Sequence, residues 1–317
     1  MYHKTKNEGS KGMYGKKDLK QNLSLYIMLA IPIAFALVFL VFPMYGLAIA
    51  FKDYNIFAAG NPISAVFASE WVGMKHFINI FNRPDFLRAF RNTMIISLLK
   101  LAFVFPIPIV FAILLNELRF LRLQKTIQTI VYLPHFLSWA IVAGIFVNLL
   151  SSTGVVNSLI QSLGGDKIDF LMSNKWFRPV IVISDAWKEV GWSSIIYFAA
   201  IAGLDQECFE AAEVDGANRF QRILYVTLPG LLPTIVLMLI LRVGSIMDAG
   251  FSQIFAIYNP TVYETGDIIG TYVYRMGLGK LDFSIGTAVG LFNSVIAFVL
   301  VLASNHFAKK ATGKSIW

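Results

Sequence analysis

The stretch EAAEVDGANRFQRILYVTLP, Glu210 to Pro229, is a polar segment between two long apolar ones. It carries carboxylates and guanidinium groups in a chain that is 56% hydrophobic and only 15% charged, with a mean hydropathy of +0.64. Soluble domains are about 45–50% apolar and about 25% charged. The composition therefore indicates an integral membrane protein, in which such a polar segment requires an explanation.

Outward from this segment, the chain contains apolar stretches long enough to span a bilayer, which takes roughly 20 helical residues. There are six of them: Leu25–Phe51, Asn92–Leu115, Ile127–Leu150, Phe177–Leu204, Leu231–Ile257 and Ile285–Phe307. We therefore predict an all-α integral membrane protein with six transmembrane helices. An even number of spans places both termini on the same side of the membrane.

The spans divide the chain into a tail, a first helix with its loop, a core and a second tail. The predicted boundaries are a basic tail over 1–24, the first helix and external loop over 25–91, a core of five helices over 92–307, and a tail over 308–317. The polar segment belongs to the loop 205–229, which joins the fourth and fifth spans of the core.

Basic residues predict the orientation, because cytoplasmic loops carry an excess of Lys and Arg. Lys and Arg are more frequent on the side that holds the two tails and the polar segment, which itself carries Arg219 and Arg222. We therefore expect both termini and the loop 205–229 to be cytoplasmic. The net charge of +8 is spread over the ends and loops of apolar segments. This distribution is typical of charges that orient a membrane protein, and it argues against a nucleic-acid partner.

Several charged residues fall inside the predicted spans, where each costs a few kcal/mol unless it faces protein or water. These residues are Lys100, Asp185, Lys188, Glu189, Arg242 and Asp248. In the fourth span the charges and Trp192 follow helical spacing and share one face. Two alternatives follow: ion pairs such as Arg242 with Asp185 or Glu189 hold the bundle together, or polar faces line a hydrophilic passage.

Tryptophans beside these charges favour a passage for sugars, which offer apolar CH faces for stacking and hydroxyls for polar groups. Aromatic side chains that anchor helix ends at the membrane interface are the alternative. The candidate pathway residues are Trp187, Lys188, Glu189, Trp192, Arg242 and Asp248.

The sequence contains none of the HExxH, GxSxG or paired Cys-x-x-Cys motifs, and Cys208 is its single cysteine. The tail ATGKS, Ala311–Ser315, is similar to the end of a P-loop, but Ala308 stands where the first Gly is required. We therefore expect no catalytic residue, no metal and no cofactor on this chain. A membrane enzyme acting through the carboxylates of the fourth span is disfavoured.

The polar segment has the local signals of two short helices around a turn. Asp205 can cap a helix that begins at Gln206, and Gly216 permits a turn in the middle. Pro229 is expected to stop the second helix. Small residues let another surface approach the backbone, and Glu210 offers a carboxylate to it. A docking surface and a polar loop lying on its own bundle are both compatible with this pattern.

The segment resembles the cytoplasmic EAA loop of type I binding-protein-dependent ABC importer permeases. The matching positions are Glu210-Ala211-Ala212, Asp215-Gly216-Ala217, Ile223 and Leu228-Pro229. Four longer stretches are similar to carbohydrate permeases for oligosaccharides or polysaccharide fragments: NTMIISLLKLAFVFPIPIVFAILLNEL (Asn92–Leu118), YLPHFLSWAIVAGIFVNLLS (Tyr132–Ser151), ISDAWKEVGWSSIIYFAAIAGL (Ile183–Leu204) and IYNPTVYETGDIIGTYVYRMGL (Ile257–Leu278).

The resemblance implies a multi-pass permease of a bacterial cell membrane that transports oligosaccharides. Its implied partners are a second homologous permease in a heterodimer, two ATPase subunits that bind ATP and Mg²⁺, and an extracellular sugar-binding lipoprotein. It assigns the coupling to the ATPase to Glu210, Ala211, Ala212, Asp215, Gly216, Ala217 and Pro229. A non-ABC channel or signalling protein with a cytoplasmic docking loop is the alternative.

Overall fold

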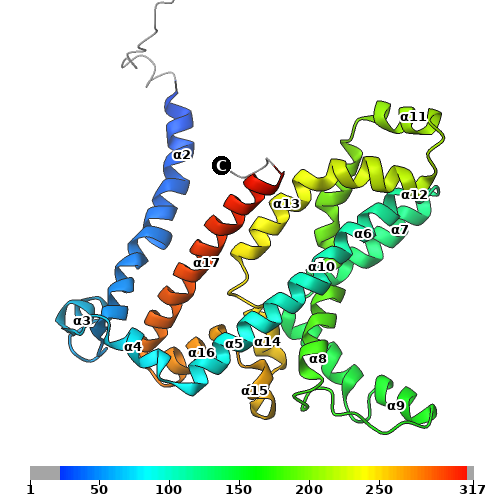
Figure 1. The fold of residues 1–317 in the computed structure, drawn as a ribbon. Helices are drawn as coiled ribbons and strands as arrows, with labels where there is room; N and C mark the ends of the chain where they lie inside the picture. Colours follow the sequence, from blue (N-terminus) through cyan, green and yellow to red (C-terminus); the bar gives the residue numbers. More distant parts are fainter. Residues whose placement is uncertain (1–21, 313–317) are drawn as a thin grey trace, which may run out of the picture.

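The computed structural model describes residues 22–312, and long helices dominate it (Figure 1). The predicted tails 1–24 and 308–317 lie partly outside these residues, and so does the ATGKS segment. The loop with α11 and α12 lies at one end of the molecule, and α3, α9 and α15 lie at the opposite end (Figure 1).

The N-terminal part is a long helical rod followed by a small cap of short elements. The elements are α2 (Leu23–Ala36), η1 (Leu37–Val41), η2 (Phe42–Phe51), β1 (Lys52–Asp53), α3 (Pro62–Ala68), β2 (Glu70–Trp71) and α4 (Lys75–Phe81). The two strands pair antiparallel, with Lys52 opposite Trp71. The α2 helix has no buried residue, and it stands apart from the bundle in Figure 1.

The middle of the chain supplies the helices that surround the candidate site. They are α5 (Pro84–Leu99), η3 (Lys100–Val104), α6 (Pro106–Asn116), α7 (Leu121–Tyr132), η4 (Leu133–Phe136), α8 (Trp139–Leu150), α9 (Val155–Ser162) and α10 (Phe177–Ala202). The α10 helix is central, because it contacts α5, α6, α7, α8, α13 and α14.

The C-terminal part contains the exposed loop, a broken helix and the last long helix. Its elements are α11 (Gln206–Val214), α12 (Arg219–Arg222), η5 (Ile223–Thr227), α13 (Leu228–Gly244), α14 (Phe251–Ile257), η6 (Pro260–Val262), α15 (Tyr263–Gly266), α16 (Ile269–Val273), η7 (Tyr274–Gly279) and α17 (Phe283–Thr312).

Within residues 22–312, five helical stretches are long and apolar enough to cross a membrane. They are Leu23–Phe51, Pro84–Asn116, Trp139–Ser162, Arg219–Gly244 and Phe283–Lys310. The α10 helix, predicted as the fourth span, is 26 residues long but carries three charged residues in its middle and is not among them. A mainly helical, multi-pass membrane fold is thus confirmed, and the sixth crossing stays a prediction.

The predicted third span Ile127–Leu150 is not one helix. The α7 helix ends at Tyr132, Pro134 lies in the short turn η4, and Leu137 and Ser138 are extended. The Ser138 hydroxyl accepts a hydrogen bond from the Ile141 amide at 3.3 Å and caps α8. The prediction of a continuous helix was wrong here because the apolar pattern continues through the break.

The predicted fifth span Leu231–Ile257 also breaks, after Gly244. Ala249 (φ 51°) and Gly250 (φ 88°) adopt left-handed backbone conformations before α14 begins. A left-handed Ala costs roughly 1–2 kcal/mol, so tertiary contacts must stabilise it. The prediction that Pro229 stops a helix was wrong as well: α12, η5 and α13 follow one another without a break, with Pro229 in the first turn of α13.

Close packing holds α10 against α7. At Gly191 of α10, a Cβ atom would lie 2.1 Å from the carbonyl oxygen of Val131 in α7, so only glycine fits. Near its other end, Tyr197 of α10 is buried with Ala112 and Leu231, from α6 and α13. This packing fixes the polar face of α10 between α7, α6 and α13.

Candidate functional site: a polar cavity and an exposed loop

The loop between α10 and α13 forms the predicted helix, turn and helix. The Asp205 carboxylate accepts a hydrogen bond from the Glu207 amide at 3.0 Å and caps α11. The chain then turns at Gly216, whose φ of +77° is left-handed. The amide of Ala217 donates to the carbonyl oxygen of Ala212 at 2.9 Å, which closes the end of α11. The predicted cap at Asp205 and the predicted turn at Gly216 are confirmed.

The loop presents exposed side chains at its end of the molecule. None of the residues of α11 is buried, and Val214 is 88% exposed. Glu213 and Arg222 pair at 3.1 Å across the turn. Of the predicted coupling residues, Glu210, Ala211, Asp215, Gly216 and Pro229 are exposed, and Ala212 and Ala217 are half-buried.

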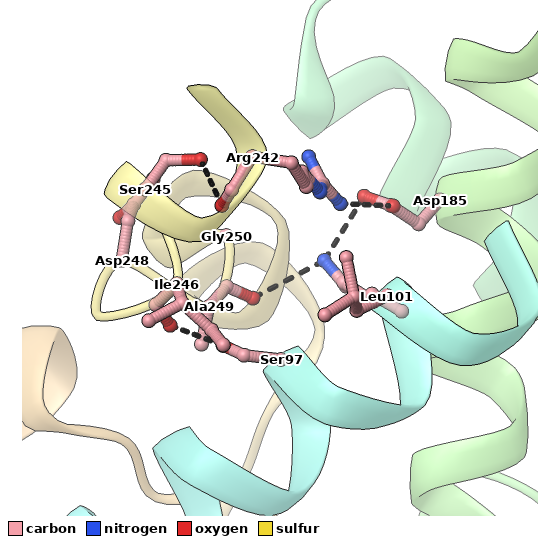
Figure 2. A pocket seen from close by; sticks show the side chains of 10 residues that line it. Ser97, Leu101, Asp185, Arg242, Ser245, Ile246, Asp248, Ala249 and Gly250 are labelled. Carbon is pink, nitrogen blue, oxygen red and sulfur yellow. Dashed lines mark hydrogen bonds and ion pairs between the residues drawn. The ribbon is translucent and has the colours of Figure 1, made fainter. Parts of the chain in front are cut away.

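Four of the six predicted charges inside the spans meet at a second place, a polar cavity beside the break between α13 and α14. Figure 2 shows the side chains that line it. They come from α5, η3, α10, α13 and the break: Ser97, Lys100, Leu101, Asp185, Arg242, Ser245, Ile246, Asp248, Ala249 and Gly250.

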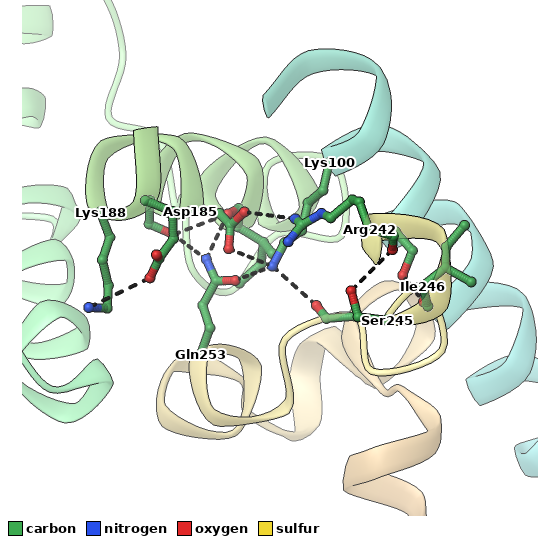
Figure 3. Close-up of polar contacts among 12 residues, drawn as sticks. Lys100, Asp185, Lys188, Arg242, Ser245, Ile246 and Gln253 are labelled. Atoms are coloured by element: carbon green, nitrogen blue, oxygen red, sulfur yellow. Dashed lines mark hydrogen bonds and ion pairs between the residues drawn. The ribbon is translucent and has the colours of Figure 1, made fainter. Parts of the chain in front are cut away.

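Lys100 is the centre of the polar network, and its side chain is only 3% exposed. Its ammonium group donates to Asp185 at 2.9 Å, to the carbonyl oxygen of Ala249 at 3.1 Å and to the Gln253 side chain at 2.5 Å (Figure 3). Gly250 has a left-handed φ of +88°, which an L side chain rarely adopts, and a Cβ there would also lie 2.6 Å from this ammonium group, so the break favours glycine. Lys100 thus holds the left-handed break in place.

The predicted pair of Arg242 with Asp185 is present, but it is long. One guanidinium nitrogen lies 3.5 Å from the second oxygen of Asp185. Asp185 is 8% exposed and Arg242 is 40% exposed. The sequence identified both residues, but it left Lys100 without a partner and gave no signal for Gln253, a polar residue in an apolar run. The carboxylate of Asp185 therefore serves two cations from two other helices.

A second cluster lies at the break between α7 and α8. The Glu189 carboxylate lies 2.8 Å from Nδ1 of His135, and the His135 ring stacks on Trp192 with centroids 4.5 Å apart. Buried Lys188 donates to the carbonyl oxygen of His135 and lies 3.7 Å from Glu189. The sequence placed these α10 residues on one face but did not indicate His135 as their shared partner.

The structure thus divides the predicted pathway residues into groups. Glu189 and Arg242 meet along a cavity of about 240 Å³, next to the one that Asp248 lines. Lys188 and Trp192 belong to the His135 cluster. Trp187 packs against Phe146, with ring centroids 5.9 Å apart. It lines neither of these two cavities.

The part of the chain that the structure describes contains no group of three or more His, Cys, Asp or Glu side chains placed to hold a metal ion. The polar side chains that line the cavity carry ammonium, guanidinium, carboxylate and hydroxyl groups. Such groups can hydrogen-bond a polar molecule as it passes, and the half-exposed Arg242 can attract an anion.

Two relatives with similar sequences extend over nearly the whole chain. Protein LplB of Bacillus subtilis (strain 168) is 45% identical over 95% of this chain and 93% of its own length. The polygalacturonan/rhamnogalacturonan transport system permease protein YteP of the same organism is 42% identical over 94% of this chain and 92% of its own. The arabinooligosaccharides transport system permease protein AraP of Halalkalibacterium halodurans is 30% identical over 73% of both chains.

Solved structures show the same fold. A chain of a bacterial ABC transporter involved in the import of the acidic polysaccharide alginate is 44% identical, with a TM-score of 0.86 over 93% of this chain and 98% of that chain. A second structure, of bacterial alginate ABC transporter in complex with an alginate pentasaccharide-bound periplasmic protein, has the same identity and TM-score.

A family match agrees with these relatives and covers the loop, together with the cavity residues from Asp185 to Gly250. Residues 104–313 match the sequence profile of binding-protein-dependent transport system inner membrane components. The chain therefore belongs to this family of membrane transport components.

Proposed function

We propose that this chain is a transmembrane permease subunit of an ATP-driven oligosaccharide importer. The observation that carries the proposal is the exposed loop 205–229, with the short helices α11 and α12 on either side of a turn, in a member of this transport family. Relatives named for the transport of polygalacturonan, arabinooligosaccharides and alginate support a carbohydrate substrate. The family match favours this function over a channel, a signalling protein or a membrane enzyme.

The loop supplies the coupling to the energy source. We assign the contact with the ATPase to α11 and the turn, through Glu210, Ala211, Ala212, Asp215, Gly216 and Ala217, with Pro229 at the base of the loop. Since α12, η5 and α13 are contiguous, a displacement of the loop reaches Arg242 on α13 directly. ATP and Mg²⁺ belong to two partner ATPase subunits in this proposal, and this chain holds no cofactor.

The pathway lies along the polar face of α10. Glu189, Arg242 and Asp248 line the two neighbouring cavities and are assigned to direct contact with the sugar. Trp187 and Trp192 are both half-exposed and offer ring faces for stacking. Lys188 is buried against the His135 backbone and supports the pathway wall. The other half of the pathway comes from a second, homologous permease.

We also propose that α10 completes six crossings. The carboxylates in its middle have partners inside the protein: Asp185 pairs with Lys100, and Glu189 lies 3.7 Å from Lys188 and 2.8 Å from Nδ1 of His135. Compensation of this kind lowers the cost of placing charges in a bilayer. Both termini and the loop then face the cytoplasm of a bacterium, and a sugar-binding lipoprotein docks on the opposite side.

The coupling role is tested by Gly216→Asp in the complete importer. Nothing lies within 4 Å of a Cβ at Gly216, so the aspartate adds a charged side chain to the loop surface without a clash. We expect the protein to reach the membrane, and oligosaccharide uptake and stimulated ATPase activity to fall at least about tenfold, the effect of losing about 1.4 kcal/mol of interaction.

Gly164→Asp is the matched control, because Gly164 has a similar φ of +82° and also has nothing within 4 Å, but lies beyond α9. Uptake through this control variant should remain near that of the unmodified importer. Normal uptake and ATPase stimulation in the Gly216→Asp importer would rule out the coupling assignment. An unmodified importer that moves no oligosaccharide would rule out the proposed function itself.

A further inference from the structure

The basic groups around the polar cavity differ in how fully their donors are used. Lys100 has three N–H donors, and all three have acceptors within the protein. Lys188 is buried, with the His135 carbonyl oxygen and Glu189 as partners. Neither ammonium group is free to bind a solute. Both are therefore structural cations.

Arg242 differs from these lysines. Its guanidinium has five N–H donors, is 40% exposed, and contacts Asp185 through one nitrogen at 3.5 Å. Charge-assisted N–H···O bonds are normally about 2.7–2.9 Å long, so this contact is loose. Arg242 lines both neighbouring cavities, and Figure 2 shows it above the break between α13 and α14.

The carboxylates nearby have other partners. Oδ1 of Asp185 is 2.9 Å from Lys100, so Asp185 keeps a counter-ion if Arg242 turns away. Glu189 is engaged by His135 and Lys188. Asp248 accepts a hydrogen bond from the Phe251 amide at 3.4 Å and lines the same cavity as Arg242, where its negative charge repels a solute anion. Arg242 can therefore exchange its long contact for a solute anion while Asp185 keeps its ion pair with Lys100.

We propose that Arg242 binds the carboxylate of a uronate residue as an oligosaccharide passes, so that this permease selects acidic oligosaccharides over neutral ones. A planar guanidinium binds a carboxylate through two parallel hydrogen bonds, which an ammonium group cannot do. Sugar hydroxyls alone give no such charge-assisted pair. The similarity to permeases named for polygalacturonan and for the acidic polysaccharide alginate agrees with this selection. The inference rests on the proposed function and adds the substrate class.

The test compares acidic and neutral uptake by the complete importer, reconstituted in vesicles with its own binding protein. The probes are oligogalacturonates, alginate oligosaccharides, the methyl esters of both and arabinooligosaccharides. Arg242→Gln removes the charge and should reduce uronate uptake about tenfold or more, as expected for a hydrogen bond to a charged group. Uptake of the neutral probes by the same variant should change much less, so the acidic-to-neutral ratio falls.

Three further variants keep the result interpretable. Arg242→Lys retains the charge but not the two-point contact, and its ratio should lie between those of the unmodified importer and Arg242→Gln. Asp248→Asn removes a cavity carboxylate that repels a solute anion, and it should raise the ratio even if Arg242→Gln fails to fold. Lys280→Gln removes an exposed positive charge outside both cavities and should leave the ratio unchanged.

The outcomes separate the inference from the proposed function. An unmodified importer that moves only neutral oligosaccharides overturns the inference and leaves the function standing. Equal ratios for the unmodified, Arg242→Gln and Asp248→Asn importers overturn it as well. An importer that moves none of the probes contradicts the function.

Discussion

At the scale of single residues, the buried Lys100 connects the largest number of separate chain segments around the polar cavity. It joins η3 to α10 through Asp185 and to the break before α14 through the carbonyl oxygen of Ala249. A buried charge of this kind is tolerated only while its partners remain. The network therefore makes three chain segments depend on one side chain.

Lys100→Met should destabilise the protein strongly, because it leaves Asp185 buried with only the long contact to Arg242. Removing one partner of a buried ion pair costs about 3–5 kcal/mol. Thermal unfolding of the purified protein in lipid nanodiscs measures the loss. The double variant Lys100→Met/Asp185→Asn should lose less than the sum of the two single changes, since residues in contact are coupled. Strict additivity would show that the pair is not energetically coupled.

At the scale of elements, two helix breaks shape the polar cavities. One lies between α7 and α8 and brings His135 to Glu189; the other lies between α13 and α14 and brings Ala249 to Lys100. Within a membrane, the backbone departs from helical geometry only where protein groups or water replace the hydrogen bonds that the helix loses. The breaks mark the places where the bundle offers polar groups to its interior.

Gly191→Ala tests the close contact that positions α10 against the first break. Its Cβ would lie 2.1 Å from the Val131 carbonyl oxygen, so the two helices must separate, at a cost of about 1–3 kcal/mol. Gly144→Ala in α8 is the matched control, because nothing lies within 4 Å of its Cβ. We expect a lower unfolding temperature for Gly191→Ala alone; equal temperatures for both variants would argue against the tight packing.

At the scale of the whole molecule, the exposed loop and the cap of short elements lie at opposite ends of the long helices (Figure 1). This arrangement separates the proposed ATPase contact from the face where a binding protein would dock. The α2 helix has no buried residue in this chain, so lipid or a partner must cover its apolar surface.

The single cysteine of the sequence reports the orientation, because Cys208 is exposed on α11. A membrane-impermeant maleimide should label Cys208 in inside-out vesicles and not in sealed right-side-out vesicles. A Cys208→Ser/Gly164→Cys variant should give the opposite pattern. Labelling of Cys208 from the outside of sealed right-side-out vesicles would invalidate the proposed topology.

The sequence by itself determined the membrane class and the local structure of the loop. Asp205 caps α11 and Gly216 turns the chain as predicted, because capping and left-handed turns depend on neighbouring residues. Asp185 was one of the two carboxylates expected to pair with Arg242 if ion pairs hold the bundle together, since unpaired charges are costly in a membrane.

The tertiary structure alone decided where the helices break and which charges share a partner. An apolar run has the same composition whether its helix is continuous or broken, so composition did not locate the breaks in Ile127–Leu150 and Leu231–Ile257, although Pro134 lies at the first of them. The break at Ala249 depends on Lys100, which lies 149 positions earlier in the sequence. A contact at that separation is set by the packing of α10 against its neighbours, and no local sequence pattern encodes it.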